Sequence, residues 1–234
     1  RSSRPSRPAA AARLDGAAPA PKLRPMVGRI IETDACVAEG AAWLAAQDPR
    51  FARALEQTGL PPLRRRPDGY PALLQAIVSQ QSSVAAAAGI QGRLDAAGAG
   101  TPEGLTALTD DDLRACGLSR PKIRYVRALA ASGLDYDALR AAPNADVLAA
   151  LTAIPGIGRW TAEIYLLFAL GRADVFAPAD LALQESARVL FDLDARPTPK
   201  PFAEMAEAWS PRRGVAARLR WAKYRVDKQR EGVT

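Results

Sequence analysis

Two features of the chain have residue types and spacing that could do chemistry: the segment 151–162 and Asp180. The segment reads Leu-Thr-Ala-Ile-Pro-Gly-Ile-Gly-Arg-Trp-Thr-Ala. Gly156 and Gly158 permit backbone shapes closed to other residues and leave no side chain at the surface. A helix that starts after them presents free N–H groups, which attract an anion such as a phosphate. Asp180 follows Trp160 by twenty residues and is expected to bring a carboxylate beside the phosphate-bearing strand that this segment would hold.

Both features also have a purely structural interpretation. A Gly-x-Gly turn can join two helices without binding anything, and Asp180 can simply cap the helix expected over 180–191. The full twelve-residue pattern favours a helix-hairpin-helix that holds DNA phosphates without sequence preference. Residues 113–123 weakly repeat this pattern without the second glycine, so they are expected to be structural.

The two roles of Asp180 are compatible with each other. A helix N-terminus favours an ionised carboxylate, so a capping aspartate is also a fixed anion. Such an anion stabilises positive charge that develops in a reaction, and it can orient or deprotonate a water molecule.

The elements that must position these residues read as helices. Strand-like alternation is absent, and Ala, Leu and Arg dominate. The pairs Asp48-Pro49, Thr101-Pro102 and Ser210-Pro211 are typical of helix starts, since proline fits the first helical position. The chain is therefore predicted to be all-α. The expected helices cover residues 34–47, 50–58, 69–79, 83–96, 102–107, 109–115, 120–132, 136–141, 144–153, 159–170, 180–191, 200–209 and 211–228.

The composition excludes several kinds of site. The 234 residues include no histidine, which rules out Ser-His-Asp and Cys-His catalysis and histidine metal ligands. Two cysteines, Cys36 and Cys116, cannot supply the four thiolates of an iron–sulfur cluster. The formal net charge is +7, and ten Lys and Arg side chains lie between Arg196 and Arg230. They predict a basic C-terminal helix that contacts phosphates.

Residues 1–27 form a basic tail that is expected to be disordered. They hold six basic residues against one acid, Asp15, a net charge of +5, and show no apolar period. Met26 is a possible true start, and an Arg-rich, acid-poor tail also suits an organelle transit peptide. No apolar run reaches eighteen residues, so no membrane span is expected. The few cysteines favour a reducing, intracellular setting, namely the cytoplasm and nucleoid of a bacterium or a eukaryotic nucleus.

Four segments together resemble the helix-hairpin-helix superfamily of DNA glycosylases, and within it the 3-methyladenine DNA glycosylase II family. The resemblance covers about residues 33–228. Besides the hairpin, it is carried by residues 70–85 (YPALLQAIVSQQSSVA), 174–181 (DVFAPADL) and 209–216 (WSPRRGVA). It implies the compact form of the family, because the segment 1–68 is too short and too helical for the N-terminal β-domain of some members.

The resemblance implies roles for residues at matching positions. Asp180 matches the catalytic aspartate, and Trp160 and Trp221 match aromatic residues that line the base pocket. Tyr165 is a further pocket candidate, next to Ile164, which occupies the place of a family tyrosine. The implied DNA-binding residues are Gln80, Gln81, Ser82, Pro155, Gly156, Gly158, Arg159, Thr161 and Arg213. The main-chain carbonyls of Thr152, Ile154 and Ile157 match a monovalent-cation site for Na⁺ or K⁺.

Two of these positions depart from the family pattern. Gln81 falls where the family has a wedge residue that fills the gap left by a flipped nucleotide, but it is polar rather than large and apolar. Ile164 makes the pocket less aromatic, so the family's substrate range does not carry over. Arg213 matches a family arginine that is either structural or faces a phosphate.

The residue at position 160 separates two mechanisms. Bifunctional relatives of the endonuclease III type place a Schiff-base lysine at this hairpin position, whereas Trp160 offers no amine. The resemblance therefore implies a monofunctional glycosylase that leaves an intact abasic site and needs no catalytic metal or organic cofactor. N-methylated purines such as 3-methyladenine and 7-methylguanine carry positive charge, which favours an aromatic face.

The implied partner is double-stranded DNA with damaged bases, bound by a monomer that flips the target nucleotide during base excision repair. The target would enter a cleft between two helical domains. One covers 69–177 and carries the hairpin, and the other joins 28–68 to 178–234 and carries Asp180. A glycosylase for mismatched adenine or uracil, and a non-catalytic DNA-binding module, are the alternatives.

Overall fold

A computed structural model describes residues 27–231, and they are predominantly helical, which confirms the all-α prediction. The strand-type pairing within this range is a single isolated antiparallel bridge between Ile30 and Arg172. The helices are α1 (Asp34–Gln47), α2 (Pro49–Thr58), α3 (Tyr70–Ser79), α4 (Val84–Ala96), α5 (Pro102–Ala107), α6 (Asp110–Ala115), α7 (Arg120–Ala130), α8 (Tyr136–Ala141), α9 (Asn144–Thr152), α10 (Arg159–Ile164), the π turn η1 (Tyr165–Ala169), α11 (Leu181–Leu190), α12 (Pro199–Ala206), the 3₁₀ turn η2 (Glu207–Trp209) and α13 (Arg213–Glu231).

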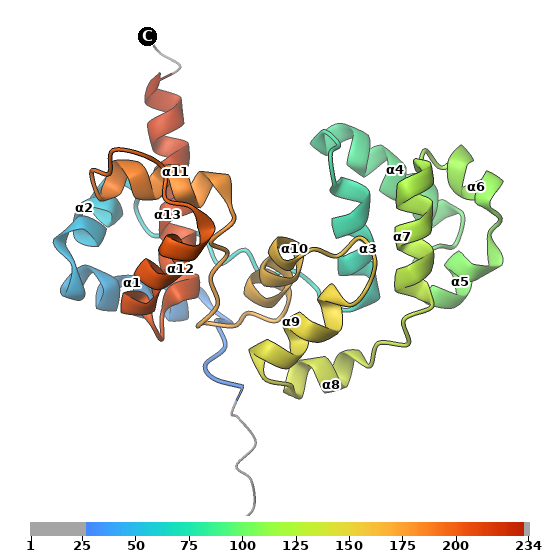
Figure 1. The fold of residues 1–234 in the computed structure, drawn as a ribbon, viewed down its shortest axis with the longest axis horizontal. Helices are drawn as coiled ribbons and strands as arrows, with labels where there is room; N and C mark the ends of the chain where they lie inside the picture. Colours follow the sequence, from blue (N-terminus) through green and yellow to red (C-terminus); the bar gives the residue numbers. More distant parts are fainter. Residues whose placement is uncertain (1–26, 232–234) are drawn as a thin grey trace, which may run out of the picture.

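The helices form two lobes on either side of α9 and α10 (Figure 1). In one lobe α13 packs against α1, α2 and α11, and in the other α7 packs against α3, α5 and α6. Helices α9 and α10 pack against each other between the lobes. The predicted domain boundaries stay a prediction, and the buried apolar side chains of the described residues form one continuous cluster through both lobes.

The expectations for the basic tail concern residues 1–26, which lie outside the described range, and Val27 at its edge. Within 27–231 no helix has the length and apolar character needed to cross a membrane.

Side-chain caps explain where several helices begin. The Asp48 carboxylate accepts the Arg50 amide at 2.9 Å, with Pro49 in the first turn of α2, as predicted. The predicted start at Ser210-Pro211 is wrong. That peptide bond is cis, α13 begins at Arg213, and the Ser210 hydroxyl donates to Asp174 at 2.9 Å instead of capping a helix. The pair Thr198-Pro199, which the sequence analysis missed, begins α12.

The prediction that the basic C-terminal helix contacts phosphates stays a prediction, and not all of its basic side chains are available for it. Arg218, Arg220 and Lys223 of α13 are buried, because this helix runs through the middle of its lobe. The Arg218 guanidinium donates to the carbonyls of Leu63, Gly214 and Leu167 at 3.1, 2.9 and 2.8 Å.

Arg220 is fully buried and has no hydrogen-bond partner within the described residues. Its guanidinium carbon lies 4.4–5.8 Å from the ring centroids of four aromatic residues, Phe51, Phe191, Phe202 and Trp209. Burial lowers the pKa of Arg220 to about 9, and that of Arg218 to about 10.

Replacing each of these two arginines by methionine is expected to change the free energy of unfolding by different amounts. Arg218→Met removes the side-chain donor from three main-chain carbonyls, so we expect the free energy of unfolding to fall by about 3 kcal/mol. Arg220→Met removes an unpartnered buried charge and keeps the apolar volume, so we expect a change within about 1 kcal/mol. Urea denaturation at pH 7 measures both values. Equal losses for the two variants would contradict this difference in hydrogen bonding.

Candidate active site and nucleic-acid interface

Asp180 receives three N–H groups from three separate helices. As the N-cap of α11 it accepts the Leu183 amide on Oδ1 at 2.9 Å. Trp221 of α13 donates its indole N–H to the same oxygen at 3.1 Å, and Trp160 of α10 donates to Oδ2 at 3.0 Å. The capping role and the site role therefore occur together in one carboxylate.

This geometry fixes the direction of the carboxylate. Both oxygens of Asp180 act only as acceptors in these bonds, which is the hydrogen-bonding pattern of an ionised carboxylate. The two indole donors come from α10 and α13, so the site forms only when these two helices are packed beside the start of α11. An anion held in this way can stabilise positive charge on a substrate atom brought next to it.

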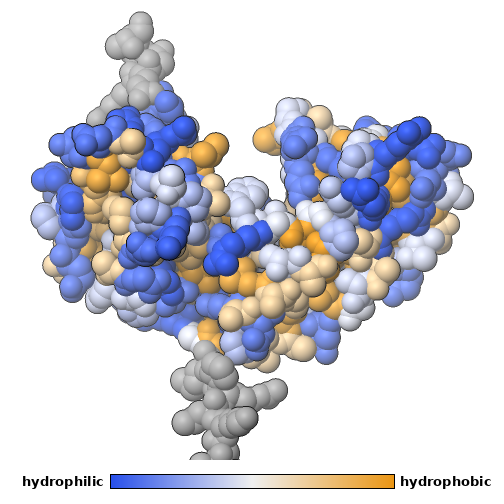
Figure 2. All heavy atoms as spheres, in the orientation of Figure 1, coloured by the Kyte–Doolittle hydropathy of each residue, from blue (hydrophilic) through white to orange (hydrophobic). Residues whose placement is uncertain are grey.

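Trp160 lies on α10 and Trp221 on α13. Figure 2 shows a deep hollow between the lobes, above the region of α10. Trp160 is 44% exposed, although most large apolar side chains are buried, so its ring is available to a ligand. Trp221 is half-buried and packs on Phe168, with ring centroids 5.4 Å apart.

The π turn η1 places Phe168 under Trp221. The sequence analysis predicted one helix over 159–170, but its second half winds as a π turn from Tyr165 to Ala169. Such turns shift the side-chain register of a helix and are frequent at functional sites. Helical spacing alone therefore did not predict the contact between Phe168 and Trp221.

The hairpin between α9 and α10 uses its two glycines differently. Gly156 has a φ of +91°, a conformation that favours glycine, and a Cβ there would lie 2.3 Å from the Tyr125 ring. Gly158 has a φ of −80° and ψ of 167°, which any residue adopts, so the prediction that its backbone needs glycine is wrong. No atom lies within 4 Å of a Cβ built on Gly158, so this position leaves the surface open.

The start of α10 has the free main-chain amides expected of a phosphate-binding site. No side chain caps this end, so the first N–H groups of the helix lack an internal acceptor. Pro155 and Arg159 are exposed beside it. Arg159 also donates to Glu163 at 2.8 Å, and burial raises the pKa of that carboxyl although the arginine opposes the shift. Thr161 is buried, so its DNA-binding role stays a prediction that concerns its main-chain amide.

The loop that follows α3 contacts the hairpin directly. The Gln80 side-chain amide donates to the Gly156 carbonyl at 2.8 Å, so Gln80 links the two segments that are predicted to contact DNA. Gln81 is exposed at the tip of this loop, and Ser82 is half-buried.

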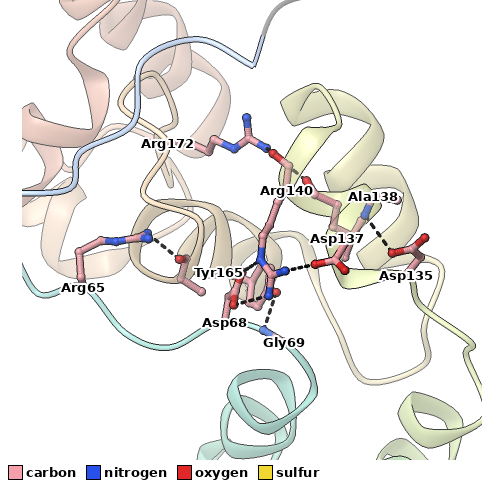
Figure 3. Close-up of polar contacts among 11 residues, drawn as sticks. Arg65, Asp68, Gly69, Asp135, Asp137, Ala138, Arg140, Tyr165 and Arg172 are labelled. Carbon is pink, nitrogen blue, oxygen red and sulfur yellow. Dashed lines mark hydrogen bonds and ion pairs between the residues drawn. The ribbon is translucent and has the colours of Figure 1, made fainter.

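Tyr165 lies away from these residues. It is buried, its hydroxyl accepts the Gly69 amide at 3.0 Å, and burial raises the pKa of its phenol. Figure 3 shows it beside the ion pair of Arg140 with Asp68, whose closest N–O distance is 2.6 Å. The structure thus places Tyr165 in the junction between α8 and the 65–69 segment, and not with Asp180.

Arg213 is held by carboxylates. It pairs with Asp174 at 2.6 Å and with Glu207 at 2.6 Å, and the Asp174 hydrogen bond raises its pKa. These ion pairs favour the structural alternative, in which Arg213 ties α13 to the segment before Asp180, and its binding to DNA stays a prediction.

Two further hollows are not lined by Asp180, Trp160 or Trp221, although Arg159 and Arg213 line the second. One, of about 360 Å³, is lined by Arg65, Asp68 and Arg140, and the other, of about 230 Å³, by Asn144, Glu163 and others. Within the described residues, no group of three His, Cys, Asp or Glu side chains is arranged to hold a metal ion.

Comparison with known proteins agrees with this geometry. Residues 74–212 match the family model described as HhH-GPD superfamily base excision DNA repair protein. The chain is 34% identical over 161 residues to the Schizosaccharomyces pombe protein named DNA-3-methyladenine glycosylase 1, covering 65% of this chain and 71% of that one. Among solved structures, a Bacillus halodurans DNA-3-methyladenine glycosidase superposes with a TM-score of 0.74 at 34% identity, covering 81% of this chain and 91% of that one. The Schizosaccharomyces pombe 3-methyladenine DNA glycosylase in complex with abasic DNA gives 0.68 at 31% identity, with 78% and 95% covered.

Proposed function

Because the chain belongs to the HhH-GPD superfamily of base excision DNA repair proteins, we propose that it is a monofunctional DNA glycosylase for alkylated purines in duplex DNA. The observation that carries this proposal is the Asp180 carboxylate, oriented by the indole N–H groups of Trp160 and Trp221. A non-catalytic binding module has no need for a fixed anion with two aromatic neighbours beside its phosphate grip.

The reaction breaks the bond between the base and C1′ of the sugar. The hairpin amides hold the strand by its phosphate, and the target nucleotide turns out of the duplex into the hollow. As the base leaves with the bonding electrons, positive charge develops on the sugar, and the Asp180 carboxylate stabilises it. Water then adds to C1′, with Asp180 accepting its proton, and an abasic site remains.

The aromatic rings favour an N-methylated purine as the leaving base. Such a base is cationic, so it gains from the exposed face of Trp160 and is already a good leaving group. Asp180 therefore has only to stabilise the sugar, and no acid is needed to protonate the base.

The absence of a lysine at position 160 supports a hydrolytic reaction without strand cleavage. Forming a Schiff base with C1′ requires an amine at that position, and a tryptophan side chain occupies it.

Base release from methylated duplex DNA tests the proposal. We expect 3-methyladenine or 7-methylguanine to be released, with strand breaks only after alkali and no covalent trapping by borohydride. Breaks without alkali would contradict the monofunctional mechanism. Release confined to mismatched adenine or uracil, or DNA binding without any release from a lesion panel, would favour those alternatives.

Trp160→Phe and Trp221→Phe test the N–H groups apart from the rings. Each variant keeps an aromatic face but removes one donor to Asp180, so we expect the rate of release to fall about tenfold with little change in lesion affinity. Trp43→Phe, a partly buried tryptophan in α1, is the control and should leave the rate unchanged. Single-turnover kinetics and binding to an abasic-site analogue separate the two quantities. A loss of affinity with an unchanged rate would contradict the positioning role.

We further propose double-stranded DNA with damaged bases as the partner of a monomeric protein, and a monovalent cation in the hairpin. Thr152 ends α9, so its carbonyl lacks a helical donor and can face a cation with the carbonyls of Ile154 and Ile157. The Ile154 carbonyl also accepts the Ile157 amide at 3.0 Å, which leaves one lone pair for an ion. The cation would neutralise part of a phosphate charge and take no part in the chemistry.

A further inference from the structure

The loop between α3 and α4, residues 80–83, holds a strained residue at its tip. Gln81 is exposed and has a φ of 52°, in the left-handed region. For a residue with a side chain this conformation costs about 1–2 kcal/mol. It persists only where neighbouring contacts determine it, so something on either side of Gln81 must hold the loop.

Lys122, in the first turn of α7, makes contacts on both sides. Its Nζ donates to the Val78 carbonyl at 2.6 Å and to the Ser82 hydroxyl at 2.8 Å. Val78 is in the last turn of α3, and Ser82 directly follows Gln81. One ammonium group therefore closes the loop across its base, while Gln80 is tied separately to the hairpin.

The charge of Lys122 has no carboxylate partner among the contacts of the described residues. Burial alone shifts its pKa, in the downward direction. A half-buried ammonium is costly unless its donors are used, and here two of its three N–H groups are spent on the loop. Lys122 lies within residues 113–123, the segment that weakly repeats the hairpin sequence. This segment lacks the second glycine and was expected to be purely structural, but Lys122 gives it a contact with the loop.

We propose that Lys122 is a positioning residue for base flipping, because it holds the Gln81 main chain where the side chain can fill the gap left by the flipped nucleotide. This inference rests on the proposed function. Without Lys122 the strained loop relaxes, the gap stays open, and the target base returns to the stack. Among the described residues, Asp180 and its two tryptophans share no hydrogen bond with Lys122, so we expect the chemical step itself to be unchanged.

The test compares single-turnover release of 7-methylguanine from two duplexes. In one the lesion pairs with cytosine, and in the other it faces an abasic-site analogue, so that no base pair has to be broken. We expect Lys122→Met to be slower by about 10- to 100-fold on the paired lesion, because unpairing costs a few kcal/mol, and by less than about threefold on the unpaired one. Lys122→Arg keeps the donors and should stay near wild type. Arg120→Met, an exposed charge in the same turn, is the charge-matched control.

A second readout does not depend on base release. With 2-aminopurine next to an abasic-site analogue, entry of the loop unstacks the probe and raises its fluorescence. At saturating protein, wild type and Lys122→Arg should raise it and Lys122→Met should not. The role of Lys122 would be overturned if Lys122→Met slowed release equally on both duplexes, or if it raised the fluorescence as much as wild type does. If wild type releases no base from either duplex, the proposed function fails, and the fluorescence still decides whether Lys122 positions the loop.

Discussion

Asp180→Asn is expected to slow base release by about 10³-fold, equivalent to roughly 4 kcal/mol of transition-state stabilisation. The amide carries no charge to offset the developing cation. In asparagine the oxygen that accepts from Leu183 and Trp221 is kept, and an NH₂ group takes the place of the oxygen that accepts from Trp160. The NH₂ group and the Trp160 indole N–H are both donors, so the hydrogen bond between them is lost. Asparagine still caps α11, so the fold and the phosphate grip remain.

Asp192→Asn is the matched control for this substitution. Asp192 is exposed after the end of α11 and has a φ of 51°, which asparagine tolerates, so the same charge is lost outside the site. Single-turnover release and affinity for an abasic-site analogue are measured for both variants. Equal release by wild type and Asp180→Asn would remove Asp180 from the mechanism.

Gly156→Ala is expected to lower the free energy of unfolding by about 2–4 kcal/mol and to weaken DNA binding at least tenfold. The new methyl group would overlap the Tyr125 ring, and alanine would have to adopt a φ of +91°. The hairpin must open to relieve this, and the Gln80 bond to the Gly156 carbonyl is lost with it.

Gly158→Ala separates binding from folding. Its φ suits alanine and no atom crowds the new methyl, so we expect stability within about 0.5 kcal/mol of wild type. The methyl would stand over the free amides of α10, so we expect weaker binding to undamaged and damaged duplexes alike. Urea denaturation and fluorescence anisotropy at one fixed salt concentration measure the pair. If Gly158→Ala bound DNA as tightly as wild type, the phosphate would not lie at the start of α10.

The sequence was informative where a local rule acts on neighbouring residues. The cap-plus-proline pairs at Asp48 and Thr101 and the hairpin turn at Gly156 depend on a few adjacent positions, and the structure has them as expected. The cap role of Asp180 is likewise local.

Contacts between distant segments were beyond such rules. The bonds from Trp160 and Trp221 to Asp180 span 20 and 41 residues, and the pairing of Arg213 with Asp174 spans 39. Charge counting alone was not enough for α13, since a run of Lys and Arg does not reveal that Arg218 and Arg220 point into the lobe. The periodicity of 159–170 also does not reveal the π turn η1, whose Phe168 packs against the distant Trp221.

The three hydrogen bonds to Asp180 have a consequence for molecular discrimination. Both indole N–H groups are spent on the carboxylate, so neither is left to read the donor and acceptor pattern on a base edge. The tryptophans can therefore sort bases only through their ring faces, by shape and electron deficiency. Contacts through shape and electron deficiency discriminate between close analogues by small factors in rate. A site that hydrogen-bonds to the base edge discriminates against the wrong base by orders of magnitude. We therefore expect the protein to release several damaged bases, with a selectivity that depends on how weakly each base is attached and stacked.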